Sequence, residues 1–541
     1  MSYNLPSRGL VSQADQAMSE AGNVPRSKFL NAWTRKTTFN ASDIVPIMVD
    51  EILPGDHMRY DFTGFIRMAT PFFPIFDNQK IDMFVFFVPA RILWTNWVRM
   101  HGEQDVPGAS IAFTVPQIVS PVGGFVRDSI YDHMGIPTVG QTDAASTISI
   151  NALPLRAYNL IFNQWFKDQN LLAGPAVQTD NGPDPQANYV LQQRAKQHDY
   201  FTSCLPWPYK FTATNIPLTG TAPVTGIGVV GAAIPGASGN RWETDKTVVT
   251  AYPFEIATNA GANLVMRFNS NIGVGATNTP KIYADLTAVG FTLNNLRQSW
   301  LIQQLLERDA RGGTRYTESV YDHFRVRSPD MRLQRAEYIG GGSAPLTLTP
   351  VAQTATGGVG VGALGAAGTA VGQYSANYAA TEHGYVLALL NVQSDLSYQQ
   401  GLHLMWTRQT RFDFYYPSLA GLGEQAVLQR EIYSTGLAGD STVFGYQERW
   451  HELRTRVSEV TGRFRSTAVT PLDGWHLAEK FAAAPTLNST FITDQGSTIL
   501  NRVLTTGAAN QQQQYLADIL VRRTAVRPMP VFGTPATLGR F

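Results

Sequence analysis

Residues 25–102 read PRSKFLNAWTRKTTFNASDIVPIMVDEILPGDHMRYDFTGFIRMATPFFPIFDNQKIDMFVFFVPARILWTNWVRMHG, and the pattern of this stretch predicts the fold. Short apolar runs are separated by Pro, Gly, Asp and Asn, which is typical of short antiparallel strands. We expect strands at residues 44–52, 58–68 and 80–88, the last with apolar side chains on both of its faces. Residues 53–56, LPGD, predict a tight turn, because proline presets φ and glycine adopts a positive φ.

Two later segments have the apolar periodicity of helices. At residues 155–172, apolar side chains recur at intervals of three and four after Pro154, a residue that favours the start of a helix. A second helix is expected at residues 293–310, where Thr292 can cap the start and a pair of glycines follows the end.

Strand-like patterns return further along the chain. Strands are expected at residues 385–392, 405–416, 443–465 and 519–526. Residues 340–380 are rich in Gly, Ala, Thr and Val with weak periodicity, and we interpret them as a loop. Many short strands with few helices predict an all-β protein.

These segments divide the chain into five parts. Residues 1–35 are polar and are interpreted as an extended N-terminal arm. Between two strand-rich blocks lies a charge-poor segment, punctuated by proline, that we interpret as a surface insertion. The expected parts are the arm at 1–35, the first part of the core at 36–210, the insertion at 211–285, the remainder of the core at 286–526 and an extended C-terminal tail at 527–541.

The composition limits the possible functions. Charged residues make up 15% of the chain, against about 25% in an ordinary globular protein, while hydrophobic residues make up 44%. Such a surface suits a subunit covered by neighbours, or alternatively a β-rich chain whose surface is mostly Thr, Asn and Gln. The 42 basic residues nearly balance the 41 acidic ones, whereas a chain that coats DNA alone should be clearly basic.

The chain shows no sign of export or membrane insertion. Cys204 is the single cysteine, so no intrachain disulfide is possible. The first 35 residues lack the apolar core of a signal peptide, and no run approaches the roughly 18 apolar residues of a membrane helix. We therefore expect that the protein does not insert into a membrane. We also expect that it is made in a cytoplasm.

Long stretches of the sequence closely resemble the major capsid proteins of microviruses, which are small single-stranded-DNA bacteriophages. The resemblance is closest to their gokushovirus-like branch. The matching stretches occur in order along the chain. They are KTTF at 36–39, VPI at 45–47, VDEILPGD at 49–56, DNQKIDMFVFFVPARILWTNW at 77–97, PLRAYNLIFNQWFKDQNL at 154–171, HDYFTSCLPWP at 198–208, ERDARGGTRYTE at 307–318, SPDMRLQRAEYIGGG at 328–342 and RPMPVFGTP at 527–535.

The resemblance implies a fold, a function and partners. The implied fold is an eight-stranded antiparallel jelly roll with long insertions. The implied function is that of a major capsid protein, with sixty copies forming a T=1 icosahedral shell around circular single-stranded DNA in the virion. The family also implies a small basic DNA-binding protein as partner and a host-cell receptor, for which a carbohydrate is a candidate. The insertion at 211–285 resembles the one that builds protrusions at the threefold axes.

Arginine clusters supply the candidate contact residues. Acidic residues interleave with Arg308, Arg311, Arg315, Arg332 and Arg335, and alternating charge favours salt-bridged subunit contacts over a phosphate track.

Near the C-terminus, basic residues exceed acidic ones. Arg522, Arg523 and Arg527 are therefore candidates to face DNA, with a solvated edge as the alternative. The segment from Phe211 to Asp285 is the candidate region for host attachment, because loops on a rigid scaffold often carry recognition.

Chemical motifs are sparse. Residues 360–365 match G-x-G-x-x-G, but neither a helix pattern nor a spaced acidic residue follows, so a chance match is favoured. The nine histidines show no metal-ligand spacing. His198, Asp199 and Cys204 could suggest a nucleophile with its base, but their aromatic neighbours favour a packing role. We expect no enzyme activity, no cofactor and no metal site.

Two other functional classes remain as alternatives. A jelly-roll carbohydrate-binding protein or glycosidase would have the same fold class, but the chain has no distinctive pair of carboxylates and no signal peptide. A cupin-type metal enzyme would need a histidine spacing that the chain lacks. Formation of shells or subassemblies, rather than monomers, would distinguish the capsid protein from both.

Overall fold

The computed structural model describes residues 25–104, 106–211, 293–352, 364–505 and 513–532, together with the backbone of four short strands between residues 224 and 284. The chain divides into two compact units. The first consists of Met1–Pro208 and Gly312–Phe541, and the second of Tyr209–Arg311. The second unit contains the segment expected to be an insertion.

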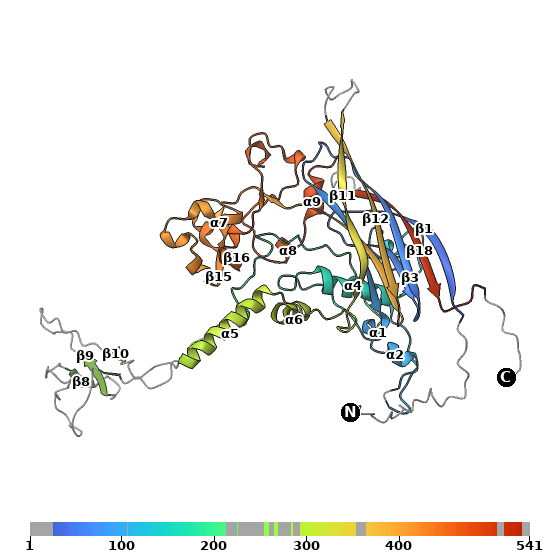
Figure 1. Cartoon of the computed structure of the whole chain (residues 1–541), viewed down its shortest axis with the longest axis horizontal. Helices are drawn as coiled ribbons and strands as arrows, with labels where there is room; N and C mark the ends of the chain where they lie inside the picture. The colour runs from blue at the N-terminus through green and yellow to red at the C-terminus, as the bar shows by residue number, and fades with distance from the viewer. Residues whose placement is uncertain are drawn as a thin grey trace, which may run out of the picture. The chain divides into compact units, whose positions relative to one another are not determined.

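Eight strands of the first unit form a single antiparallel sheet (Figure 1). Their order across the sheet is β1-β18-β3-β12-β11-β4-β13-β2. The strands are β1 (Ser27–Phe39), β2 (Val45–Ile52), β3 (His57–Met68), β4 (Gln79–Pro89), β11 (Glu337–Ala352), β12 (Leu364–Ala379), β13 (Gly384–Ser394) and β18 (Tyr515–Arg527).

The pairing of these strands is nested. The first strand pairs with the last, β2 with β13, β3 with β12, and β4 with β11. A long hairpin that is rolled up produces this pattern, which is the topology of a jelly roll. The expected all-β, eight-stranded antiparallel jelly roll is confirmed.

The rolled sheet has two halves. Sheet I is defined as β1-β18-β3-β12 and sheet II as β11-β4-β13-β2, and the pairing of β11 with β12 joins them. Between them lies a core to which both halves contribute, for example Phe62 and Val521 from sheet I and Val85 and Leu390 from sheet II. Burying apolar side chains from both halves is the main force that keeps the sheet rolled.

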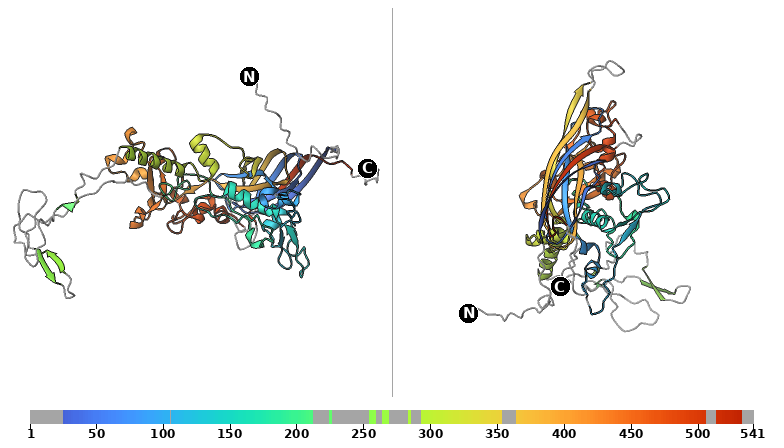
Figure 2. Two further views of the ribbon diagram at one scale, coloured as in Figure 1. Left: turned by 90° about the horizontal axis from the view of Figure 1, so that it is seen from below. Right: turned by 90° about the vertical axis from the view of Figure 1, so that its right-hand side faces the viewer.

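The two halves differ on their outward faces. Sheet II is covered there by a second core, in which Phe86 and Leu387 of the sheet pack with Tyr158 and Phe162 of the helical segment. Figure 2 shows this segment, in blue-green, beside the strands. Strand β4 therefore has buried side chains on both faces, as its continuous apolar run indicates. Sheet I carries exposed side chains on its outward face, including Leu30, Phe65 and Leu516.

Shorter elements complete the two units. In the first unit the strands are β5 (Gln117–Val119), β6 (Ser149–Asn151), β14 (Ser397–Tyr398), β15 (Glu424–Leu428), β16 (Val443–Glu448) and β17 (Ser458–Glu459). Its helices are α1 (Ala90–Leu93), α2 (Trp97–Met100), α3 (Ile130–Met134), α4 (Leu153–Ile161), α6 (Tyr316–Phe324), α7 (Gln429–Ile432), α8 (Ser489–Ile492) and α9 (Gly496–Asn501). The second unit contains β7 (Val224–Thr225), β8 (Phe254–Thr258), β9 (Leu264–Phe268), β10 (Tyr283–Ala284) and α5 (Leu293–Arg311).

Several elements lie where the sequence predicts them. The strands expected at 44–52, 58–68, 80–88, 385–392 and 519–526 correspond to β2, β3, β4, β13 and β18, and the helix expected at 293–310 corresponds to α5. The LPGD turn is also present. Gly55 has φ +87°, and the backbone N–H of Asp56 donates to the Leu53 carbonyl at 3.0 Å.

The interpretation of residues 340–380 as a loop is wrong. The described part of this segment belongs to β11 and β12, two long strands at the junction of the two halves. Small residues are needed there because Tyr374 lies flat against its own strand and the neighbouring one. A Cβ on Gly372 would come within 2.2 Å of the Tyr374 hydroxyl, and one on Gly342 within 3.0 Å of its ring. The Gly-rich composition thus reflects close packing rather than a loop.

Other boundaries also differ from the predictions. The helix expected at 155–172 ends at Phe166, after one turn of π-helix at Phe162–Phe166. The Asp168 carboxylate then accepts the backbone N–H groups of Asn170 and Leu171, both at 2.8 Å, which favours a turn over further helix. The N-terminal arm is shorter than 1–35 because residues 27–35 belong to β1, and residues 1–24 lie outside the described part of the chain.

Two predicted strands are largely irregular. Residues 405–416 form 3₁₀ turns, because the Asp413 carboxylate accepts the backbone N–H groups of Gln409 and Thr410 at 3.0 and 2.7 Å. In the segment 443–465, β16 ends at Glu448. Trp450, two residues later, has φ +69°, which no strand can accommodate.

Candidate nucleic-acid and subunit-contact surfaces

The three arginines expected to face DNA lie on different sides of sheet I. In β18 successive side chains alternate between the two faces, and the buried residues Ile519, Val521 and Ala525 define the inward side. Arg523 is on this inward side, whereas Arg522 is exposed on the outward face. Because side chains alternate along the strand, the neighbouring residues Arg522 and Arg523 lie on opposite faces of the sheet.

Arg523 is engaged inside the protein. One of its guanidinium nitrogens, Nη1, donates to both carboxylate oxygens of Asp50 on β2 at 2.7 Å, and Nη2 donates to Asn31 on β1 at 3.0 Å. The Tyr60 hydroxyl on β3 donates to the same Asp50 carboxylate at 2.7 Å. The guanidinium also lies 5.5 Å from the centre of the Trp33 ring. This network links the edge strand of sheet II to sheet I.

Arg527 extends the network to the LPGD turn. It donates to the Glu51 carbonyl at 2.8 Å and lies 3.4 Å from the buried Asp56 carboxylate. Internal charge pairs thus occupy two of the three arginines, and both hold the open edge of the rolled sheet. That these three arginines face DNA stays a prediction. Of the three, Arg522 has the geometry that best fits a contact with DNA.

The outward face of sheet I carries further cations. Alternation and exposure place Lys28, Lys36, Arg59, Arg67 and Arg522 on this face. Two carboxylates share the face: Asp61, which Arg59 contacts at 3.1 Å, and Asp518. Exposed Phe65 lies among them. Basic side chains around an aromatic ring are the combination that single-stranded nucleic acids favour.

A groove borders one end of this face. It has a volume of about 1030 Å³ and is lined by β1 residues 35–38, by Phe65 and Arg67, and by Asp132 and His133 of helix α3. Arg35 donates to the carbonyl of Asp132 at 3.3 Å and to that of His133, and burial lowers the pKa of the His133 imidazole. Charges of both signs line the groove, so it is not a phosphate track.

The five arginines expected at subunit contacts are described separately for the two units. In the second unit, Arg308 and Arg311 lie in the last turn of α5. In the first unit, Arg315 contacts Glu318 at 3.0 Å and Arg335 contacts Asp330 at 2.6 Å, so these two already have partners in the chain. Arg332 is exposed.

Most of the candidate attachment region, including Asp285, lies outside the described residues. Phe211, at its start, is described and exposed.

Of the three residues considered for catalysis, Cys204 and Asp199 have structural roles, and His198 is exposed. The Cys204 thiol is buried, donates to the Tyr200 carbonyl at 3.3 Å, and has its pKa raised by burial, which opposes formation of a thiolate. The Asp199 carboxylate accepts the N–H groups of Phe201 and Thr202 at 2.9 and 2.8 Å. Cys204 belongs to a cluster with Tyr200 and Phe201, which agrees with the packing role.

The searches for metal sites and membrane helices cover the described residues alone. Within that part of the chain, no three His, Cys, Asp or Glu side chains are arranged to hold a metal ion. No described helix has both the length and the apolar character needed to cross a membrane.

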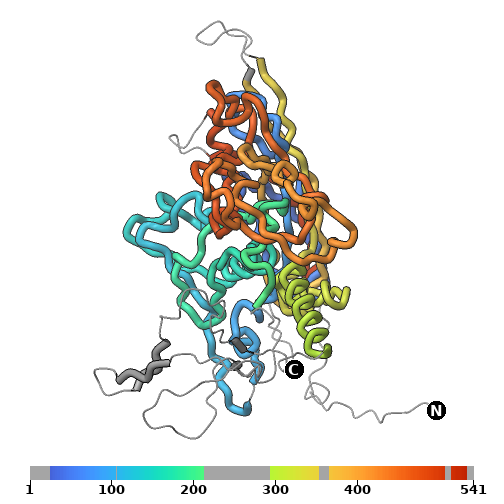
Figure 3. Tube along the Cα trace, turned by 90° about the vertical axis from the view of Figure 1, so that its left-hand side faces the viewer, coloured from blue at the N-terminus to red at the C-terminus, as the bar shows by residue number. Residues whose placement is uncertain are grey.

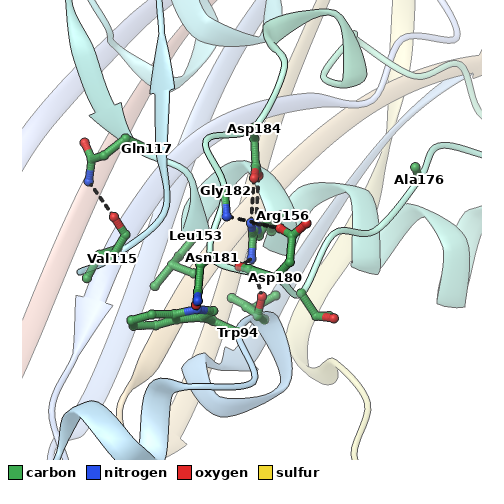
Figure 4. A network of polar contacts seen from close by, with 12 residues as sticks. Trp94, Val115, Gln117, Leu153, Arg156, Ala176, Asp180, Asn181, Gly182 and Asp184 are labelled. Atoms are coloured by element: carbon green, nitrogen blue, oxygen red, sulfur yellow. Dashed lines mark hydrogen bonds and ion pairs between the residues drawn. The ribbon is translucent and has the colours of Figure 1, made fainter. Parts of the chain in front are cut away.

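A buried ionic network ties the segment that contains Asp180 and Asp184 to helix α4. Arg156 of α4 is fully buried and contacts the buried Asp184 carboxylate through Nε at 2.8 Å and Nη2 at 2.6 Å (Figure 4). It also donates to the carbonyls of Leu93 and Asp180 at 3.1 and 2.9 Å. Sequence reasoning missed this network, because single Arg and Asp residues 28 positions apart carry no local signal.

Comparison with known proteins identifies relatives along almost the whole chain. The family model described as "Capsid protein (F protein)" matches residues 17–537. The capsid protein VP1 of Bdellovibrio phage phiMH2K is 44% identical over 96% of this chain and 97% of its own. The capsid proteins VP1 of Chlamydia phage 1 and Spiroplasma virus 4 are 36% and 35% identical, each over at least 95% of both chains.

We predict that Arg156→Met lowers the free energy of unfolding of the unassembled subunit by about 3–5 kcal/mol, because it leaves the Asp184 carboxylate buried and unpaired. The matched control is Arg59→Met, which breaks an exposed pair and should cost less than about 1 kcal/mol. Urea unfolding of both variants is the measurement, and equal losses would contradict the assigned role of the buried network.

Proposed function

The chain belongs to the capsid protein (F protein) family of microviruses, and from this premise we propose that sixty copies assemble into a T=1 icosahedral shell around circular single-stranded DNA. The jelly roll supplies a rigid block whose loops and faces meet neighbouring copies. Closed symmetry fixes which surfaces meet, since each copy presents the same patches.

The observation that carries this proposal is the exposure of α5. Of its 19 residues only Ala310 is buried, while Leu293, Trp300 and Leu305 are exposed. Trp300 and the next two residues, Leu301 and Ile302, are all exposed, and they point in directions about 100° apart. A helix that is apolar on several sides is normally buried, so neighbouring copies are the expected cover. Arg308 and Arg311, in the last turn of α5, are proposed to extend this contact. Arg315, Arg332 and Arg335 of the first unit are proposed as subunit contacts in their own right.

We predict that assembled particles unfold at a higher temperature than isolated subunits. Assembly binds the folded form, so it stabilises that form by mass action. Differential scanning calorimetry of particles and of dissociated subunits is the measurement. Equal unfolding temperatures, or the absence of any particles in a purified preparation, would contradict the proposed assembly.

The outward face of sheet I is proposed to face the genome. Its five basic and two acidic side chains give it a local excess of positive charge, while the whole chain carries a net charge of +1. A charge of +1 per copy cannot balance a packaged strand with one negative charge per nucleotide. We therefore propose that a small basic DNA-binding protein shares the neutralisation of the genome.

We predict that Arg522→Gln reduces the salt dependence of single-stranded DNA binding, with the slope of log K against log salt falling by about 0.7 for a lost phosphate contact. Arg523→Gln is the matched control on the next residue. It should leave the slope unchanged but lower the free energy of unfolding by about 2 kcal/mol, because Asp50 loses the closest of its cations and keeps the Tyr60 hydrogen bond.

Titration of labelled single-stranded DNA at several salt concentrations measures this slope. The opposite pattern, with Arg523→Gln alone changing the slope, would contradict the assignment of the outward face. Tight binding that persists at high salt would contradict a shared neutralisation.

The segment from Phe211 to Asp285 is proposed to lie on the outside of the particle and to contribute to host attachment, with a carbohydrate as a candidate receptor. Its interruption of two core blocks supports this proposal, because recognition is commonly carried by loops on a rigid scaffold.

We predict that a phage with this segment shortened still assembles particles but adsorbs poorly to host cells. Adsorption is measured as the loss of free particles after mixing with cells, with particle yield as the control for folding. Normal adsorption by the shortened phage would rule out the attachment role.

The chain is further proposed to have no enzymatic activity, and its virion location follows from its structural role. Cys204→Ser and His198→Gln should change packing at most, since Cys204 is buried and His198 is exposed. A hydrolytic or redox turnover that disappears with either change would overturn this proposal.

A further inference from the structure

A dense group of aromatic side chains projects from the first unit between β14 and β15. We define the aromatic segment as residues 405–416, which read MWTRQTRFDFYY. The 3₁₀ turn at Leu404–Thr407 overlaps its start, the turn at Arg411–Asp413 lies within it, and a third such turn follows at Pro417–Leu419. In Figure 3 the orange part of the chain, to which this segment belongs, faces the viewer.

The aromatic side chains of this segment are largely exposed. The exposed fractions are 71% for Trp406, 69% for Phe412, 51% for Phe414, 47% for Tyr415 and 40% for Tyr416. With about 200 Å² for a fully exposed aromatic residue, the five expose about 550 Å². This reaches the upper end of the range for the largest apolar patch on a monomer, about 300–600 Å².

Contacts with Glu452 and Trp450 fix the conformation of the aromatic segment. Arg408 pairs with the buried Glu452 at 2.9 Å, and its guanidinium lies 5.9 Å from the Phe414 ring centre. The Tyr415 ring meets Trp450 edge-on at 5.5 Å, and Trp450 in turn donates to the Leu419 carbonyl at 3.1 Å. A patch that is already ordered loses little conformational entropy on binding.

We propose that the aromatic segment is a contact surface between copies of this chain in the assembled shell. This inference rests on the proposed self-assembly, and it adds the surface that carries it. A stable protein contact buries about 800 Å² on each partner, so the five rings would supply roughly two-thirds of one side. Trp, Tyr and Arg are the residues that dominate binding energy at such contacts.

The chemistry of the segment favours a protein partner over a glycan. A sugar site places several convergent polar groups beside the stacked ring. Here Asp413 is occupied by the backbone N–H groups of Gln409 and Thr410, and Arg408 by Glu452. Arg411 lies 5.5 Å from the Tyr416 ring centre. Five of the nine exposed residues of the segment are aromatic, which suits the core of a protein–protein contact.

The first experiment compares assembly by two variants and a control. Trp406→Ser and Phe412→Ser should each raise, by about 30-fold, the subunit concentration at which half of the protein is assembled. Val469→Ser is the matched control, because Val469 is a fully exposed apolar residue outside the segment and should leave this concentration unchanged. Sedimentation through a sucrose gradient over a range of concentrations is the measurement.

The outcomes separate this inference from the proposed function. If the natural chain forms no particles, self-assembly itself is wrong. If it assembles and both variants assemble equally well, only the assignment of the aromatic segment is wrong. If the variants assemble normally but no longer adsorb to host cells, the segment binds a receptor instead.

A second measurement does not depend on the folding of any variant. Hydroxyl-radical labelling of the natural chain should modify Trp406 and Phe412 at least fivefold less in particles than in free subunits, because neighbours cover them. Val469 should be labelled equally in both states. Equal labelling of Trp406 in particles and subunits would overturn the proposal.

Discussion

The pairing of the first strand with the last is the constraint on which the rest of the structure depends. Strand β1 pairs with β18 along its whole length, from Ser27 opposite Arg527 to Phe39 opposite Tyr515. The other three nested pairs lie inside this one, so every loop and insertion leaves from a scaffold closed by the two ends of the chain. Arg523, Asp50 and Tyr60 then tie the free edge of sheet II to sheet I. Rolling the sheet produces one half that is covered on both faces and one half with an outward face left open.

How far the fold can be predicted from the sequence depends on the local pattern of each element. Strands such as β3 and β4 have clear alternation or continuous apolar runs, so their positions follow from the sequence. Strands β11 and β12 do not, because their glycines and alanines are required by contact with Tyr374, a long-range relation that composition cannot reveal. The jelly-roll topology came from resemblance, since local patterns do not specify which strands pair.

The candidate surfaces were predictable to a smaller extent. An excess of arginine near the C-terminus was visible in the sequence, but the partners of Arg523 and Arg527 lie on β2 and in the turn after it, more than 450 positions away. Only the alternation of β18 distinguishes Arg522 from its neighbour, and it requires knowledge of the buried face. The aromatic segment at 405–416 was visible as an apolar run, but its exposure was not, because an exposed run and a buried strand have the same composition.

As a proposed shell subunit, this chain exposes apolar and basic surfaces that other molecules are expected to cover. A cryo-electron microscopy map of particles assembled from the chain tests this claim most directly. The account predicts a closed shell of sixty copies, with the outward face of sheet I toward the interior and the aromatic segment buried between copies. A map in which sheet I faces the exterior and the aromatic segment is open to solvent would contradict it.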